Sequence, residues 1–329
     1  MSKRSHRATA LVAALLLPVG IALATTSPAN AQVTPAATAN FAVAPYVDMT
    51  ISTENLLNTA ITGHGLKAYT AAFIIGEGCT NIWGDTEPIG HDPFIDPEIA
   101  KAKSEGASLI ISSGGADGFP LPWTCTNAST IVSAYQTVIN AYGVSRLDFD
   151  VEGAAVADPT SAGRLFTAMK TLQSRNSGFQ FSVTLPVLPS GLTADGVNIL
   201  KAAQKVGVKI PLVNIMAMDY NQGNQNMGTA AVNAAKATLA QMKSVNSGYT
   251  FANLGITPMI GVNDDGSTFT LANAKSVESF AKSNGLGRLA FWSITRDQSC
   301  GAAASAFASP TCSGVSQGQL AFTSAFVPF

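Results

Sequence analysis

Three carboxyl side chains that could carry out acid–base chemistry, Asp148, Asp150 and Glu152, alternate with apolar residues in one short run of the chain. Alternate side chains of a β-strand share one face, so the three carboxyl groups would point the same way over about 13 Å, at about 3.3 Å per residue. Like charges repel, and burial disfavours the ionised form of a carboxyl group. Three carboxyl groups on one face are therefore costly unless they take part in a reaction. We predict a catalytic cluster here.

Two other interpretations of this run are a calcium site and an edge strand that faces water. The apolar residues Phe149 and Val151 between the acids argue against a solvated edge strand. Calcium loops of the Asp-x-Asp type usually carry glycine and further oxygen ligands nearby. We therefore expect a catalytic site that uses no metal ion and no cofactor.

The scaffold for these acids is predicted from β-rich runs that recur about every 30 to 40 residues, with helical patterns between them. Nearly continuous apolar strands that alternate with helices indicate a parallel sheet. Eight such units in about 290 residues predict a single (β/α)8 TIM barrel. An open doubly wound sheet is the alternative, but no glycine-rich nucleotide-binding motif follows the first strand. The predicted strands are Phe41–Val47, Tyr69–Ile75, Ser108–Ser113, Arg146–Val151, Phe179–Thr184, Leu212–Met218, Gly255–Ile260 and Arg288–Trp292.

Active sites of such barrels lie at the carboxyl ends of the strands, which brings further residues beside the acids. Glu152 follows the fourth strand and would lie at the mouth of the barrel, with Asp148 and Asp150 deeper inside. An aromatic or methionine side chain taken alone more often fills a core than binds a ligand, but position at a strand end favours binding. The candidates for substrate binding are Tyr46, Met218, Asp219, Tyr220 and Trp292 near strand ends, and Trp123 in the loop after the third strand.

These motifs resemble those of a secreted bacterial chitinase of glycoside hydrolase family 18. The family signature Asp-Gly-x-Asp-x-Asp-x-Glu ends the fourth barrel strand, and its last three acids match the acids of the run described above. Ser145 and Arg146 replace the first Asp-Gly, which shortens the family's proton relay by one acid. The resemblance covers about residues 40–329. The other matching motifs are Ser112-Ser113-Gly114-Gly115, Met216-Ala217-Met218-Asp219-Tyr220 and the strand-eight residue Trp292.

The resemblance implies hydrolysis of β-1,4 bonds between N-acetylglucosamine units, with the acetamide of the substrate as nucleophile. Glu152 would serve as general acid and then as general base. Asp150 would accept a hydrogen bond from the acetamide N–H, and Asp148 would share a proton with Asp150. Asp219 and Tyr220 would hold the acetamide oxygen in line for attack.

The resemblance further implies that Trp292 stacks on the sugar ring, and that the partner is chitin or chito-oligosaccharides. One alternative is a barrel that binds chitin-like sugars without cutting them, as a lectin does. Members of that kind usually lack the general acid or its supporting Asp, whereas all three acids are present here. A second alternative is an endo-β-N-acetylglucosaminidase that cuts the core of N-glycans, since it shares the signature.

The start of the chain predicts export. Lys3, Arg4 and Arg7 form a basic head, residues 8–24 are apolar, and residues 29–31 offer a small-x-small cleavage site. A membrane anchor is the alternative, but the proline, the glycine and the cleavage site in this region fit removal better. We expect a secreted, extracellular protein composed of a signal peptide at 1–31, a disordered leader at 32–40 and a (β/α)8 catalytic domain at 41–329.

The charge balance gives no reason to expect a nucleic-acid or membrane partner, because the net charge is −1 and the pI is about 6.3. We expect a monomer. The four cysteines of an exported chain predict two disulfides, for which the count alone allows three connectivities. On a barrel, Cys79 and Cys125 follow neighbouring strands, which predicts that they pair and that Cys300 and Cys312 close a loop after the eighth strand.

The connections between strands predict the shape of the site. Helices are expected to start at Thr126-Asn127 and at Asp158-Pro159, where capping residues or proline precede apolar periodicity. About 25 residues join the seventh and eighth strands, and Leu271–Asn284 has a helical pattern. That helix is the ordinary barrel unit, so the sequence leaves no room for an inserted domain there. We therefore expect an open groove and cleavage within the polymer chain. Trp83, Phe119 and Trp123 either line this groove or pack against the loops of Cys79 and Cys125.

Overall fold

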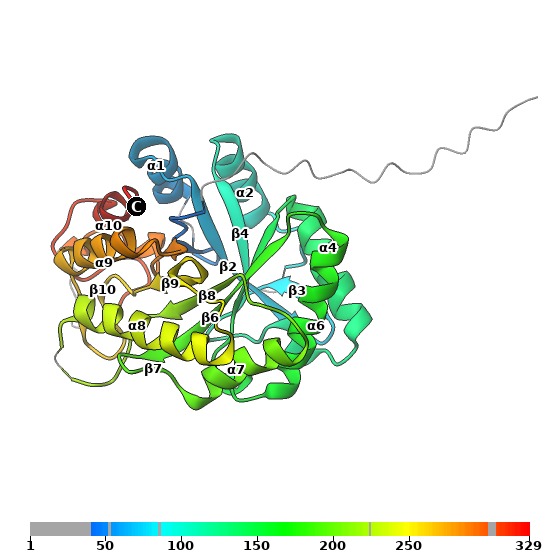
Figure 1. Ribbon diagram of the computed structural model, residues 1–329. Coiled ribbons are helices and arrows are strands. Elements are labelled where there is room, and N and C mark those ends of the chain that lie inside the picture. Colours follow the sequence, from blue (N-terminus) through cyan, green and yellow to red (C-terminus); the bar gives the residue numbers. More distant parts are fainter. Residues whose placement is uncertain (1–40, 52–53, 85–86, 224, 302–306) are drawn as a thin grey trace, which may run out of the picture. The chain divides into compact units, whose positions relative to one another are not determined.

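The computed structural model describes residues 41–329 apart from 52–53, 85–86, 224 and 302–306 (Figure 1). The predicted signal peptide at 1–31 and leader at 32–40 lie outside the described residues. None of the described helices is both long and apolar enough to cross a lipid bilayer.

A parallel sheet forms the centre of this part of the chain, in the strand order β1-β2-β4-β5-β6-β8-β9-β12. Each of these eight strands lies in the sheet beside the one that precedes it in this order along the chain, as the predicted barrel requires. The strands are β1 (Tyr46–Asp48), β2 (Ala68–Glu77), β4 (Ser108–Gly114), β5 (Arg146–Asp150), β6 (Gln180–Leu188), β8 (Leu212–Met216), β9 (Leu254–Thr257) and β12 (Arg288–Leu289).

The sheet closes between its first and last strands. The backbone N–H of Ala44 donates to the carbonyl of Leu289, and that of Tyr46 donates to the carbonyl of Phe291, both at 3.0 Å. These contacts confirm the (β/α)8 barrel. The first strand starts later than predicted because Pro45 has no N–H to give to a ladder, so the residues before it make isolated contacts.

Helices cover the outside of the sheet, with α4, α6, α7, α8 and α9 around the central strands in Figure 1. Both predicted helix starts are confirmed, because Asn127 caps α4 and Asp158 caps α6 through side-chain oxygens. The helices are α1 (Glu54–His64), α2 (Ile95–Ser104), α3 (Leu121–Thr124), α4 (Ala128–Tyr142), α5 (Gly153–Val156), α6 (Pro159–Arg175), α7 (Ala194–Lys205), α8 (Met227–Val245), α9 (Leu271–Asn284) and α10 (Ala321–Phe326).

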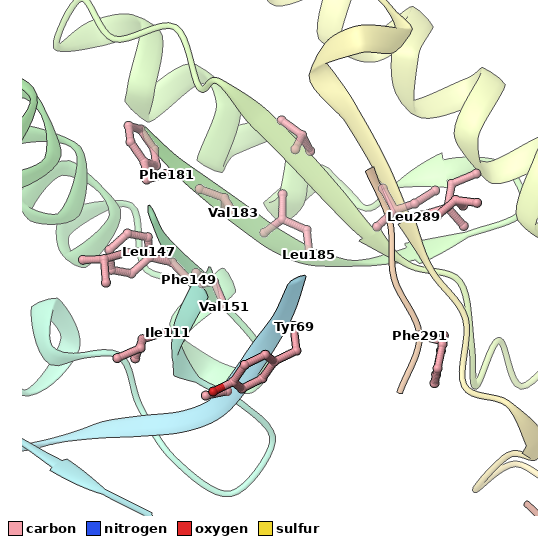
Figure 2. Packing of buried hydrophobic residues seen from close by; sticks show 14 of the residues in the cluster. Tyr69, Ile111, Leu147, Phe149, Val151, Phe181, Val183, Leu185, Leu289 and Phe291 are labelled. Carbon is pink, nitrogen blue, oxygen red and sulfur yellow. The ribbon is translucent and has the colours of Figure 1, made fainter. Parts of the chain in front are cut away.

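The apolar core lies between the sheet and these helices. Figure 2 shows Leu147, Phe149 and Val151 of the β5 segment beside apolar side chains of the neighbouring strands. The ring of Phe149 meets Tyr135 of α4 edge to face, with the centroids 5.2 Å apart. Because side chains alternate along a strand, packing these residues outward turns Asp148 and Asp150 toward the barrel interior.

Short antiparallel strands extend the carboxyl end of the barrel. β3 (Thr80–Trp83) pairs with β2, β7 (Gly191–Leu192) pairs with β6, and β10 (Gly261–Val262) forms a hairpin with β11 (Thr268–Phe269). These strands were not predicted, because two to four residues are too few to show a period of two. The predicted helix at 271–284 is confirmed as α9, and residues 258–287 hold no inserted domain beyond it and the hairpin.

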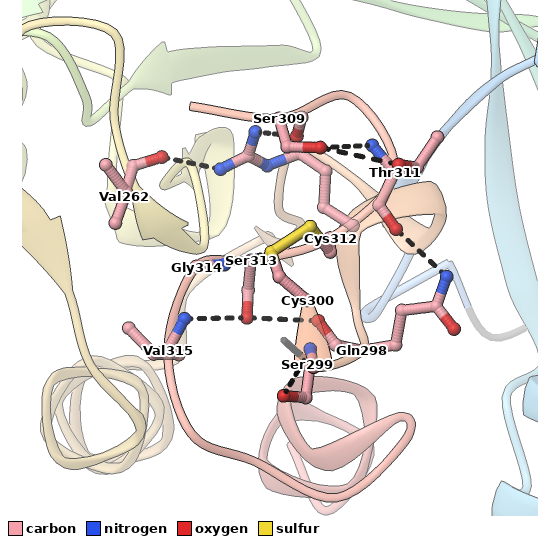
Figure 3. Close-up of a disulfide and its surroundings, with 12 residues drawn as sticks. Val262, Gln298, Ser299, Cys300, Ser309, Thr311, Cys312, Ser313, Gly314 and Val315 are labelled. Carbon is pink, nitrogen blue, oxygen red and sulfur yellow. Dashed lines mark hydrogen bonds between the residues drawn. A yellow bond between two sulfur atoms is a disulfide. The ribbon is translucent and has the colours of Figure 1, made fainter. Parts of the chain in front are cut away.

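Both predicted disulfides are confirmed. Cys79 in the turn between β2 and β3 bonds Cys125 after α3, and Cys300 bonds Cys312 in the loop after β12. Figure 3 shows the second bridge with Ser313 beside it. The carbonyl of Ser313 accepts a hydrogen bond of 2.7 Å from the backbone N–H of Val262 in β10, so this loop is attached to the hairpin after β9.

Candidate active site

A cavity of about 240 Å³ opens at the carboxyl ends of the barrel strands. The cavity brings together most of the residues predicted from the sequence, although they come from four different strands or the loops after them. The predicted residues that line it are Tyr46, Asp150, Glu152, Met218, Asp219 and Trp292.

Asp148 lies beneath this cavity and is fully buried. Its two oxygens accept hydrogen bonds from four hydroxyl groups, those of Tyr46 at 2.8 Å, Ser112 at 2.7 Å, Ser182 at 2.5 Å and Thr184 at 2.9 Å. Ser112 and Ser182 are the residues paired with Asp148 on the two neighbouring strands, so the register of the sheet places them there. A buried carboxylate is tolerated when donors surround it in this way.

Asp150 is 5% exposed, and its Oδ1 atom is buried without a hydrogen-bond partner. Burial raises its pKa, and the charges of Glu152 and Asp148 raise it further. Hydroxyl groups donate to both oxygens of Asp148, and its negative charge acts on Asp150, while the proton shared between the two aspartates stays a prediction. A buried acceptor without a donor is costly, and Asp150 lies where a ligand could supply one.

Glu152 follows β5 at the mouth of the cavity. Burial raises the pKa of its carboxyl group to about 7, and the negative charges of Asp117 and Asp219 contribute to that rise. Asp117 lies in the loop after β4, and the sequence analysis did not identify it. Its signal was weak, because a single acid two residues beyond a glycine pair does not predict chemistry.

The glycine pair Gly114-Gly115 brings that loop against the catalytic strand. Gly114 has a φ of 117°, and a Cβ atom there would lie 2.1 Å from the carbonyl oxygen of Asp150. Gly115 has a φ of 89°, and a Cβ atom there would lie 2.7 Å from the ring of Phe73. The Ser-x-Gly-Gly motif therefore allows β4, Asp150 and Phe73 to approach one another as no other residue pair would.

An aromatic wall forms one side of the cavity. The rings of Phe73 and Trp292 stack with centroids 5.6 Å apart and an interplanar angle of 14°, and Tyr46 lies 6.1 Å from Trp292. Met216 and Met259 also line the cavity and make its floor apolar. Phe73 was not predicted as a site residue, because it lies in the middle of a strand, where an aromatic residue usually belongs to the core.

Asp219 also lines the cavity and is held by the β10–β11 hairpin. Its Oδ1 atom accepts a hydrogen bond of 3.0 Å from the backbone N–H of Asp265, and Asp219 itself has a φ of 47°. Burial is the largest cause of its raised pKa, and the charges of Asp264 and Asp265 add to it. Asp264 also lines the cavity, so the unpredicted hairpin contributes to the site.

Two predicted binding residues lie outside the cavity lining. Tyr220 is 3% exposed within the core, and its hydroxyl group is buried without a partner. Trp123 stacks on Phe119 at 5.1 Å with an interplanar angle of 20°, and Phe119 is 39% exposed. Trp83 is fully buried and donates from its indole to the hydroxyl of Tyr142 at 2.8 Å, so it packs beneath the loops.

Among the residues that the structure describes, no group of His, Cys, Asp and Glu side chains is arranged to hold a metal ion.

A scan against protein-family models finds no match for the chain. The chain is 33% identical over 311 residues to a probable bifunctional chitinase/lysozyme of Escherichia coli K12, covering 87% of this chain and 34% of that protein. It is also 33% identical over 273 residues to endochitinase 11 of Metarhizium anisopliae, covering 77% of this chain and 52% of that protein. The chain therefore spans about a third and about half of the length of these two relatives.

The fold agrees with a solved structure at a comparable level of identity. The catalytic domain of a hyperthermophilic chitinase from Pyrococcus furiosus matches with a TM-score of 0.78 and 32% identity, covering 87% of this chain and 93% of that one. The chain belongs to the chitinases of glycoside hydrolase family 18.

Proposed function

We propose that this chain hydrolyses β-1,4 bonds within chitin and chito-oligosaccharides, that the acetamide of the substrate is the nucleophile, and that Glu152 is the general acid and base. The observation that carries the proposal is the pairing at the end of β5. Glu152 holds a proton up to a pH of about 7, and the neighbouring Asp150 has a buried oxygen without a donor. An acid kept protonated near neutral pH suits proton donation to a leaving group.

The first step follows from these positions. Glu152 donates its proton to the glycosidic oxygen while the acetamide oxygen attacks the anomeric carbon and the glycosidic bond breaks. The acetamide N–H donates to the free oxygen of Asp150, whose negative charge balances the positive charge of the cyclic intermediate. Trp292 stacks on the sugar ring, and Asp219 holds the acetamide in line for attack.

The second step returns the enzyme to its starting state. Ionised Glu152 takes a proton from water, and the resulting hydroxide attacks the anomeric carbon and opens the ring of the intermediate. Two displacements on opposite faces leave the product in the β configuration. Because the donor form of Glu152 is needed at the start, activity is expected to fall as the pH rises through about 7.

The surroundings of the site support an endo-acting enzyme. The segment between β9 and β12 holds a two-stranded hairpin and helix α9 and no larger wall. A shallow groove of this kind contacts fewer sugars and favours attack at internal bonds.

Two disulfides support export, since such bonds persist in oxidising compartments. The predicted signal at residues 1–31 agrees with a secreted protein.

A comparison of two substrates tests the proposal. The full chain is incubated with colloidal chitin and, in parallel, with a glycoprotein that carries high-mannose N-glycans, and released sugars are measured by mass spectrometry. We expect soluble chito-oligosaccharides from chitin and an intact glycoprotein. Release of N-glycans without chitin cleavage would instead support an endo-β-N-acetylglucosaminidase. Binding of chitin without products from either substrate would support a lectin-like barrel.

A further inference from the structure

A second cavity, of about 250 Å³, lies at the amino-terminal ends of the barrel strands. Its lining includes the first residues of four strands, namely Arg146 of β5, Gln180 of β6, Leu212 of β8 and Arg288 of β12. Parallel strands all begin at the same edge of a sheet. This cavity is therefore at the opposite end of the barrel from the candidate active site.

Two guanidinium groups line this cavity, and each has an N–H donor that makes no hydrogen bond within the protein. Arg288 is 5% exposed and donates from Nη1 to the hydroxyl of Ser182 at 2.9 Å, while its Nε atom is buried without a partner. The Nε atom of Arg146 is also buried without a partner, and its guanidinium lies 4.3 Å from the centroid of the Phe41 ring. Burial lowers the pKa of Arg146 to about 10, and the positive charge of Arg288 contributes to that change.

The described residues that line the cavity include no carboxyl group. The negative charge of Asp148, on the far side of Ser182, favours the charged form of Arg288, whereas the charge that acts on Arg146 is the positive one of Arg288. Residues 1–40, which precede Phe41, contain neither Asp nor Glu, so the chain upstream brings no carboxylate side chain either. A buried charge without a counter-charge is costly, and a guanidinium presents a planar fork of donors that matches an oxyanion. Arg146 also stands where the family 18 signature has glycine, so this charge is a feature of the present chain.

We propose that this amino-terminal cavity binds a small oxyanion, such as phosphate or sulfate, between the guanidinium groups of Arg146 and Arg288. The anion accepts hydrogen bonds from N–H groups of the two guanidinium groups that line the cavity and relieves the repulsion between the two cations. One hydroxyl group joins this site to the acids, because Ser182 accepts from Arg288 and donates to Asp148. The proposed anion is therefore connected, through Arg288 and Ser182, to Asp148 of the catalytic strand.

Calorimetric titration of the full chain with inorganic phosphate tests this proposal, at pH 7 and constant ionic strength, with sulfate and chloride in parallel arms. No sugar is present, so the result does not depend on chitin hydrolysis. Wild type is expected to bind phosphate or sulfate at one saturable site and chloride much more weakly. Arg146→Gln is expected to lose about tenfold or more in affinity, because one charged hydrogen-bonding partner is removed. The matched control is Arg175→Gln, which removes an exposed guanidinium at the end of α6 and should leave the affinity unchanged.

Circular dichroism shows whether each variant is folded before titration. If Arg146→Gln does not fold, Arg146→Lys decides the question, since it keeps the charge, removes the fork and should bind several-fold more weakly. The proposal is overturned if wild type shows no saturable binding, if the folded Arg146 variant binds as well as wild type, or if chloride binds as tightly as phosphate.

Discussion

The two ends of strand β5 lie in opposite electrostatic surroundings. At the carboxyl end, Asp150 and Glu152 line a cavity of about 240 Å³ and have raised pKa values. At the amino end, Arg146 and Arg288 line a cavity of about 250 Å³ and have unused donors. Asp148 lies between the two ends and is surrounded by four hydroxyl groups.

The difference shows that one strand can carry reactive acids at one end and structural hydrogen bonds in its middle. At the carboxyl end, burial and neighbouring negative charges disfavour ionisation, which prepares the acids for proton transfer. In the middle, Asp148 has all the donors that a carboxylate needs, so this layer can be rigid without being reactive. Changes at the carboxyl end should therefore alter activity, whereas changes in the middle and at the amino end should first alter stability or anion binding.

The largest effect is expected from Glu152→Gln at the carboxyl end. The amide cannot donate a proton, so turnover of a chromogenic chito-oligosaccharide should fall about 10² to 10⁴-fold, with sugar binding retained. Above pH 7 the variant should be at least as stable to heat, because a raised carboxyl pKa means that ionisation weakens the folded state. Glu278→Gln on α9 is the matched control, since it changes a half-buried carboxyl group that pairs with Lys282 and does not line the cavity. Turnover above roughly a tenth of wild type would contradict the role of Glu152 as general acid.

The second effect concerns the disulfides that attach the loops at the carboxyl end. Replacing both Cys79 and Cys125 with Ala should lower the free energy of unfolding by about 2 to 4 kcal/mol, measured by guanidinium denaturation. Replacing Cys300 and Cys312 should cost about 1 kcal/mol less, because the sequence separation is 12 residues instead of 46. An equal or reversed order would show that loop entropy is not the main contribution of these bonds.

A third effect is expected around Asp148, in the middle of strand β5. Ser182→Ala removes a donor to Asp148 and the partner of Arg288, which should lower the free energy of unfolding by about 1.5 to 3 kcal/mol. Ser113→Ala on β4 is the control, because its hydroxyl contacts the neutral Tyr135 and should contribute about 0.5 to 1.5 kcal/mol. Equal costs for the two substitutions would argue against a special role for the charged layer.

The smallest effect is a change in pH dependence. The charge of Asp117 raises the pKa of Glu152, so Asp117→Asn should lower that pKa, and activity should be lost at a lower pH than in wild type. The measurement is the basic limb of kcat/KM against pH. Asp195→Asn, at an exposed position in the first turn of α7, should leave this limb in place. A basic limb that moves to higher pH in Asp117→Asn would contradict the sign of the interaction.

Much of the scaffold was predictable because the barrel strands are regular and apolar. The alternation in 145–153 placed the three acids on the inner face, and the spacing of Cys79 and Cys125 predicted their pairing once the strands were neighbours. The short hairpin of β10 and β11 was not predictable, since two residues per strand show no periodicity. That hairpin holds Asp219 and brings Asp264 to the cavity.

Other parts of the site depend on contacts that no local pattern reveals. Phe73 reaches the cavity because Gly115 makes room for its ring, and these residues are far apart in the sequence, in β2 and in the loop after β4. Tyr220 follows Asp219 directly, but its side chain turns into the core. The hydroxyl shell of Asp148 comes from residues far apart in the sequence, such as Tyr46 and Thr184, and becomes visible only once the strand register is known.

The most direct test of the proposed mechanism is the configuration of the first product. A proton NMR time course of chito-oligosaccharide hydrolysis by the full chain distinguishes the two anomers before they equilibrate. Attack by the substrate's acetamide followed by water predicts that the β-anomer of the new reducing end forms first. Initial formation of the α-anomer would mean a single displacement by water, and would contradict the roles proposed for Asp150 and Glu152.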